Sequence, residues 1–214
     1  MKKRLDLRVP LALLGVVLIV GAVVLIAGGS SASPKKQAAS KQGSFAASGL
    51  LSPVSAAPPL ALRDYLGRPV NIDSYKGKVL LVTFLYTHCP DVCPLIASNL
   101  RVAQNLMPAA VRSKVQMIAV SVDPRGDTPK AVGSFLANHQ MTGRMLYLVG
   151  SARELGPVWQ AWGVGSEKDA EKPEFINHSG LIYGITGSGK RLTIYAANFQ
   201  PSDIAHDVPL LAVR

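Results

Sequence analysis

Continuous apolar runs mark the central strands of this chain. Residues 79–86, 115–122 and 145–149 read VLLVTFLY, VQMIAVSV and MLYLV, and each is rich in β-branched, aromatic or other apolar residues. Runs of this length without polar alternation are typical of strands that are buried on both faces of a sheet. The pattern therefore predicts three strands at the centre of a sheet.

Apolar residues with helical spacing fill the segments between these runs. In 93–107 they recur every three or four residues, which predicts an amphipathic helix. Thr128 followed by Pro129, and a capping-box pattern that begins at Ser151, are typical of helix N-termini. A last helix begins near Pro201, and Pro209 is expected to kink or end it because proline lacks the N–H of the helical hydrogen bond.

Two turns that contain glycine indicate hairpins. The segments 180–186 and 191–196 flank Gly-Ser-Gly, and 60–74 is expected to form a smaller hairpin that turns at 66–68. With strands and helices in this order, the sequence predicts an α/β sandwich whose sheet is mainly parallel and carries one antiparallel hairpin. The folded domain is expected to span 60–214.

The N-terminal part of the chain has a different character. Residues 11–27 are almost wholly Leu, Val, Ile, Ala and Gly. As a helix they would span about 25 Å, close to the hydrocarbon thickness of a membrane. The pattern predicts a basic cytoplasmic segment at 1–9, a transmembrane signal-anchor at 10–29 and a flexible linker at 30–59, which is rich in Ser, Ala, Gly, Pro and Lys.

A cleaved signal peptide is the alternative for this apolar segment, since 30–33 offers small residues for cleavage. The apolar run is longer than is usual for a signal peptide, which favours a retained anchor. Basic residues precede the run, so the positive-inside rule places the N-terminus in the cytoplasm. The domain is then expected on the far side of a bacterial inner membrane, in the oxidising periplasm.

The net charge of +10 is concentrated towards the N-terminus. Residues 1–58 hold seven Lys or Arg and one Asp, whereas the rest of the chain holds 16 basic and 12 acidic residues. No basic run with interleaved aromatic residues occurs in the predicted domain, so nucleic-acid binding has little support. The basic charge instead reflects the flanks of the membrane segment and a mildly positive domain.

The two cysteines of the chain, Cys89 and Cys93, lie in the stretch THCPDVCP directly after the first central strand. Open α/β sheets place their sites at this end of their strands. At a helix N-terminus, residues four apart bring two sulfurs to one point or into a disulfide, and the helix end lowers the thiol pKa. A redox dithiol and part of a metal site are both chemically open. A structural disulfide is less favoured because its loop is too short to stabilise the fold much.

A metal site at two cysteines needs a further ligand, such as an imidazole. His139 and His206 fit surface positions, and His88 points elsewhere if Cys89 faces the site. His178 lies in a loop before a predicted strand. If that strand runs antiparallel to the first central strand, His178 comes to the same end of the sheet as Cys89.

Three motifs, FLYTHCPDVCPL, VSVDPRGDTP and NHSGLIYGIT, closely resemble the Sco/SenC family of membrane-anchored copper proteins. They occur in the family's order, and the resemblance covers about 60–207. It implies a thioredoxin-like sandwich with a mixed sheet and an added N-terminal hairpin, preceded by one transmembrane helix. It also implies an antiparallel strand after His178.

The resemblance implies that Cys89, Cys93 and His178 bind one copper ion, as Cu(I) or Cu(II). It implies a metallochaperone that delivers copper to, or reduces the cysteines of, the CuA centre of cytochrome c oxidase. Other copper carriers or thiol reductants are its further expected partners. Asp91 and Asp123 are candidate outer-shell groups, and both are equally well explained as turn residues. Family members often have an acidic residue where this chain has Asn177, directly before the histidine.

The alternative function is a membrane-anchored thiol-disulfide oxidoreductase without a copper-transfer role, in which Cys89 or Cys93 attacks a target disulfide. His178 separates the two hypotheses, because only copper binding needs it. A third class, the thiol peroxidases, would need an activating arginine beside a cysteine, and the sequence identifies none.

Two other patterns imitate binding sites. GITGSGKR at 184–191 approaches a phosphate-binding loop, but Arg191 stands where Ser or Thr is required and a strand is predicted to follow, so a hairpin turn is favoured. Met141 and Met145 are spaced like thioether ligands, yet two methionines without clustered partners are more typical of packing.

Overall fold

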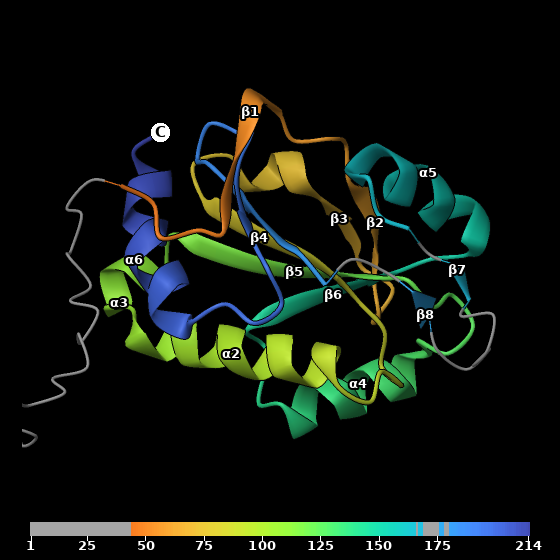
Figure 1. Cartoon of the computed structure of the whole chain (residues 1–214). Helices are drawn as coiled ribbons and strands as arrows, with labels where there is room; N and C mark the ends of the chain where they lie inside the picture. Colours follow the sequence, from red (N-terminus) through yellow and green to blue (C-terminus); the bar gives the residue numbers. More distant parts are fainter. Residues whose placement is uncertain (1–43, 166, 169–175, 178–179) are drawn as a thin grey trace, which may run out of the picture. The chain divides into compact units, whose positions relative to one another are not determined.

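The computed structural model describes residues 44–165, 167–168, 176–177 and 180–214. Its main feature is an eight-stranded sheet with the strand order β1-β10-β9-β4-β5-β6-β2-β3 (Figure 1). The strands are β1 (Gly49–Ala56), β2 (Ala61–Asp64), β3 (Pro69–Asn71), β4 (Val79–Leu85), β5 (Val115–Ser121), β6 (Met145–Val149), β9 (Ile182–Ile185) and β10 (Lys190–Tyr195). A separate two-stranded ribbon joins β7 (Glu167–Lys168) to β8 (Ile176–Asn177).

The sheet is mixed, as the family resemblance predicts. Strands β4, β5 and β6 are parallel neighbours, whereas β9 is antiparallel to β4 and β10 is antiparallel to β9. The hairpin of β2 and β3 adds to the other side through β6. Gly67 has a φ of 84° and makes the turn of this hairpin possible.

Helices cover both faces of the sheet. They are η1 (Ile72–Tyr75), α2 (Val92–Leu106), α3 (Ala109–Arg112), α4 (Pro129–Asn138), α5 (Ala152–Trp162) and α6 (Pro201–Ala212). In Figure 1, α2 and α4 lie along one face of the sheet and α5 lies on the other. The predicted caps are present: the Thr128 side chain accepts a hydrogen bond from the Ala131 N–H, and Ser151 forms a capping box with Glu154.

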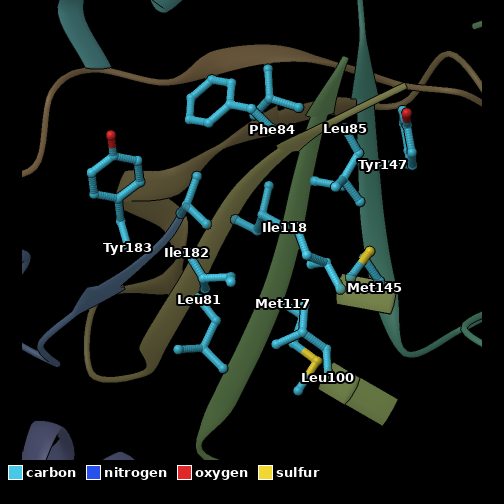
Figure 2. Packing of buried hydrophobic residues seen from close by; sticks show 14 of the residues in the cluster. Leu81, Phe84, Leu85, Leu100, Met117, Ile118, Met145, Tyr147, Ile182 and Tyr183 are labelled. Carbon is cyan, nitrogen blue, oxygen red and sulfur yellow. The ribbon is translucent and has the colours of Figure 1, made fainter. Parts of the chain in front are cut away.

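The core lies between these layers and explains the apolar runs of the sequence. Every residue of β4 is buried, and so is nearly all of β5. Figure 2 shows part of this core on β4, β5, β6 and β9. The prediction of burial on both faces is confirmed for β4 and β5, whereas two of the five residues of β6, Leu146 and Val149, are only partly buried. Met141 and Met145 are 0% and 4% exposed, which fits packing rather than a thioether site.

The domain begins earlier than predicted. The expected linker extends to residue 59, but Gly49–Ala56 forms β1, which pairs with β10. Just before β1, the side chain of Asp207 accepts hydrogen bonds from the N–H groups of Ala46 and Ala47. The Ser-, Ala- and Pro-rich sequence hides this strand, because its backbone pairing, rather than an apolar pattern, holds it.

Asp207 is expected to be important for the stability of this edge of the domain. Its carboxylate is fully buried and also accepts a hydrogen bond of 2.9 Å from the Tyr195 hydroxyl. Asp207→Ala leaves several donors without their acceptor, so it should lower the free energy of unfolding by about 3 kcal/mol. Urea unfolding of the full chain in detergent, followed by tryptophan fluorescence, measures the change. The exposed Asp73→Ala is the control, and equal stability of the two variants would contradict this role.

Helix α6 contradicts one of the two expected effects of Pro209, namely that it ends the helix. It does not end at Pro209 but continues to Ala212. Leu211, in this last turn, is fully buried, so its packing offsets the helical hydrogen bond that proline cannot donate.

The hairpin over 184–191 is confirmed. Gly189 has a φ of 82°, and the N–H of Thr186 donates to the carbonyl of Lys190 across the turn. A strand follows this turn instead of the helix that a phosphate-binding loop requires.

Within the part of the chain that the structure describes, no helix is long and apolar enough to cross a membrane. The predicted signal-anchor at 10–29 and the first part of the predicted linker lie outside the described residues.

Candidate functional site

The two cysteines lie at the C-terminal end of β4, where a short loop leads into α2. Cys89 is 7% exposed and Cys93 is fully buried, and no disulfide joins them. The backbone N–H of Cys93 donates a hydrogen bond of 3.3 Å to the sulfur of Cys89. The first turn of α2 therefore brings both side chains to one place, as the spacing of four residues predicts.

The two thiols have opposite acid–base properties. The hydrogen bond from the Cys93 side chain lowers the pKa of Cys89 from its ordinary 9.0 to about 6. The backbone N–H groups of Asp91 and Cys93 add to this effect, while burial opposes it. The hydrogen bond that the Cys93 thiol donates to Cys89, together with burial, raises the pKa of Cys93 far above its usual range. The pair therefore favours a thiolate at Cys89 and a protonated thiol at Cys93.

Asp91 connects this pair to the helix. It is the N-cap of α2, and its side chain accepts from the Val92 N–H. The sulfur of Cys89 lies 3.6 Å from Asp91 Oδ1, a contact that favours a protonated thiol. The backbone N–H groups of Asp91 and Cys93 and the Cys93 thiol all favour the Cys89 thiolate instead. Together they outweigh the effect of the Asp91 carboxylate on the Cys89 pKa. Asp91 thus has a demonstrated capping role beside Cys89, and its outer-shell role stays a prediction.

The chain enters β9 at the same end of the sheet. Strand β9 is antiparallel to β4, with Ile182 opposite Thr83 near the end of β4. A Cβ on Gly180 would come within 3.2 Å of Val92 and 3.6 Å of Ile96, so the chain before β9 lies against the first turns of α2. The predicted antiparallel direction is confirmed. His178 itself lies outside the described residues.

The other three histidines make contacts away from the cysteine pair's hydrogen bonds. His139 caps the end of α4, packs on Phe135 with ring centroids 4.6 Å apart, and has a pKa that burial lowers. His206 pairs with Asp207 at 2.7 Å. His88 is exposed and lies 3.2 Å from the Thr87 hydroxyl. In the described residues, no group of three or more His, Cys, Asp and Glu side chains is placed to hold a metal ion.

Asp123 stabilises its own turn. Its Oδ1 accepts hydrogen bonds from the N–H groups of Arg125 at 3.2 Å and Gly126 at 3.0 Å. This is the turn-forming role that the sequence also allowed, and the outer-shell role of Asp123 stays a prediction.

A buried carboxyl beside the loop is not among the site residues predicted from the sequence. Asp127 is 5% exposed, and its Oδ1 accepts a hydrogen bond of 2.7 Å from the N–H of Thr87, two residues before Cys89. In the sequence it stands directly before Thr128 and Pro129, where an acidic residue is easily attributed to the start of the helix. Its place shortly after a central strand was the available signal.

A sequence model of the SCO1/SenC family matches residues 52–212. The chain belongs to the SCO1/SenC family. The match begins within β1 and therefore agrees with the earlier start of the domain. The family predicted from the three sequence motifs is confirmed.

Relatives and solved structures support this assignment. The human "Protein SCO1 homolog, mitochondrial" is 25% identical over 154 residues, which cover 70% of this chain and 50% of the human protein. The SCO1/SenC chain thus spans about half the length of that relative. ScoI of Bradyrhizobium japonicum, solved with copper bound, is 30% identical with a TM-score of 0.59, covering 73% of this chain and 99% of that one.

A further solved structure is BsSco, for which a disulfide switch is described. BsSco is called a member of the Sco family of cytochrome c oxidase assembly proteins. It is 27% identical to the SCO1/SenC chain, with a TM-score of 0.61, and the match covers 75% of this chain and 94% of BsSco. These matches confirm the thioredoxin-like fold that the resemblance implies.

Proposed function

We propose that this SCO1/SenC chain binds copper through Cys89, Cys93 and His178. The observation that carries the proposal is the pair of reduced sulfurs, with the Cys93 N–H and thiol both directed to the sulfur of Cys89. In this role the chain delivers copper to, or prepares the cysteines of, the CuA centre of cytochrome c oxidase. The copper-bound ScoI structure and the oxidase-assembly role ascribed to the family of BsSco support this assignment.

The chemistry of the two sulfurs suits copper. Soft thiolates select Cu(I), and a set of thiolates with imidazole also suits Cu(II). Cys89 is already ionised at neutral pH, whereas Cys93 must release its proton when a metal binds, so copper binding releases protons. Burial of both residues keeps water from competing for the metal.

The chain direction at β9 supports the choice of the third ligand. Gly180 lies against the first turns of α2, and β9 begins at the end of the sheet where Cys89 and Cys93 lie. His178 is two residues before Gly180. This supports His178 as the imidazole that completes a three-ligand site.

His178→Ala tests the proposed site. The reduced full chain in detergent should bind about one copper ion. The variant should bind copper at least about tenfold more weakly, because even the loss of a residue that only hydrogen-bonds to a ligand lowers affinity by about this much. Competition with a chromogenic Cu(I) chelator measures the affinity. His139→Ala removes another imidazole, at the end of α4, and should leave the affinity unchanged. Equal affinity of His178→Ala and the wild type would exclude His178 as a ligand.

A thiol-disulfide oxidoreductase is the second candidate function. A thiolate at Cys89 beside a buried thiol at Cys93 is the arrangement of an attacking and a resolving cysteine. This function needs both cysteines but no histidine, so His178→Ala should reduce a model disulfide at the wild-type rate. If the reduced wild type bound no copper, the oxidoreductase would become the preferred function.

The proposed location is the outer face of a bacterial inner membrane, with residues 10–29 as a single-pass anchor and the domain in the periplasm. The apolar run and the basic residues before it support this proposal. Because copper needs reduced cysteines, a chain in this compartment also needs a thiol reductant as a partner. Protease treatment of spheroplasts should degrade the domain, and protection of the domain would contradict the proposed orientation.

A further inference from the structure

One buried carboxylate links the three parallel strands, at the ends of β4 and β5 and in the middle of β6. Asp127 Oδ1 accepts from the N–H of Thr87, which follows β4. Its Oδ2 accepts hydrogen bonds of 2.6 Å from the Ser121 hydroxyl, at the end of β5, and 2.9 Å from the Tyr147 hydroxyl, on β6. Asp127 also directly precedes the N-cap of α4. It therefore joins three strands and one helix at the end of the sheet where the cysteines lie.

The register of the sheet explains why these groups meet. Ser121 is opposite Leu85 on β4, and Tyr147 is opposite Ala119 on β5. Residues that pair in register point to the same face of a sheet, and so do residues two apart on one strand. The hydroxyls of Ser121 and Tyr147 therefore belong to one face, and Asp127 accepts from both. Ser121 Oγ in turn accepts from the N–H of Asp123 at 3.1 Å, which extends the network.

The contact with Thr87 has a direct consequence for Cys89. Thr87 lies two residues before Cys89, and the N–H of Cys89 donates to the carbonyl of Tyr86 at 3.4 Å. The position of the Thr87 amide thus fixes the start of the short turn that carries Cys89. Both sulfurs must be held within about 0.5 Å of their working geometry to act together on one ion or one disulfide.

We propose that Asp127 is a positioning residue for the Cys89–Cys93 pair, which holds the Cys89 turn in register with α2 through the Thr87 N–H. The inference rests on the proposed function for its copper readout. It requires an acceptor oxygen at the position of Asp127 Oδ1, and it does not require a negative charge there.

Substitutions of Asp127 separate geometry from charge. Asp127→Asn keeps an oxygen for the Thr87 N–H, and its amide group can donate to the hydroxyls of Ser121 and Tyr147, which then act as acceptors. Asp127→Glu keeps the charge but displaces the carboxylate by one methylene. Asp127→Ala removes the acceptor without added volume. Tyr147→Phe is the matched control, because it removes one donor to Oδ2 and leaves the acceptor of Thr87 in place.

The test measures three properties of each variant in the full chain. They are the Cu(I) affinity by chelator competition, the visible thiolate-to-Cu(II) charge-transfer spectrum, and the reduction potential of the Cys89–Cys93 disulfide against glutathione. Asp127→Asn and Tyr147→Phe should match the wild type within about threefold in affinity and keep its spectrum. Asp127→Glu and Asp127→Ala should bind copper about tenfold more weakly, as expected for groups that orient ligands, with a changed spectrum and a shifted potential.

Three outcomes would overturn the inference. They are a wild-type spectrum, affinity and potential in Asp127→Ala, an equal loss in Asp127→Asn and Asp127→Ala, or a loss that thermal unfolding of the variants fully explains. If the wild type itself binds no copper, the proposed function fails while the inference does not. The reduction potentials then decide, and a shift in Asp127→Ala that is absent from Asp127→Asn still supports positioning.

Discussion

Cys93→Ser is expected to abolish copper binding almost completely. The substitution replaces a buried sulfur with a hydroxyl of similar size that neither ionises at neutral pH nor offers a soft ligand. Loss of a residue that hydrogen-bonds to a metal ligand lowers metal affinity by about ten- to hundredfold. Loss of a ligand itself should therefore lower the copper affinity by more than about a hundredfold. Titration of the reduced full chain with Cu(I) in the presence of a chelator measures the loss.

Ser98→Ala is the control for Cys93→Ser. Ser98 lies on the same helix, contacts His139 at 3.4 Å, and belongs to no proposed ligand set. Its replacement should leave the copper affinity within about threefold of the wild type, because it removes only the hydroxyl of a half-buried residue and no proposed copper ligand. If Cys93→Ser kept wild-type affinity, the two sulfurs could not share one ion, and the proposed copper site would be rejected.

The elements that carry the site could be predicted because their signals are local. The apolar runs of β4 and β5 and the helical spacing after Cys93 each depend on neighbouring residues, and these elements were found within one residue of their bounds. The end of β4 then fixed the place of Cys89. The direction of β9 needed the family resemblance in addition, because no local pattern distinguishes a parallel strand from an antiparallel one.

The features that were missed depend on contacts between distant segments. Strand β1 is held by backbone pairing with β10 and by Asp207, which is 160 residues from Ala47. Asp127 becomes important only because Thr87, 40 residues earlier, lies beside it in the fold. Neither contact leaves a periodic pattern in the sequence. Buried carboxylates are therefore best sought among acidic residues that closely follow central strands, even where a helix start also explains them.

The ionisation of Cys89 leads to a second large effect, on the pH dependence of alkylation. The Cys93 thiol lowers the pKa of Cys89 to about 6, so the alkylation rate should rise with pH to a midpoint near that value and level off above it. Below the midpoint, the rate should fall about tenfold per pH unit as the thiolate is protonated. The midpoint is the quantity to compare, because a thiolate of lower pKa is also intrinsically less nucleophilic.

Cys93→Ala identifies the cause of this shift. The variant removes the donor that contributes most to the lowered pKa and leaves Cys89 as the remaining thiol of the chain, so the midpoint should move up towards the ordinary 9.0. Initial rates with iodoacetamide between pH 5 and 9.5, with a metal chelator present, measure both profiles. An unchanged midpoint in Cys93→Ala would show that the helix N-terminus alone ionises Cys89. A midpoint near 9.0 in the wild type would leave both cysteines protonated at neutral pH, and copper would then have to displace two protons instead of one.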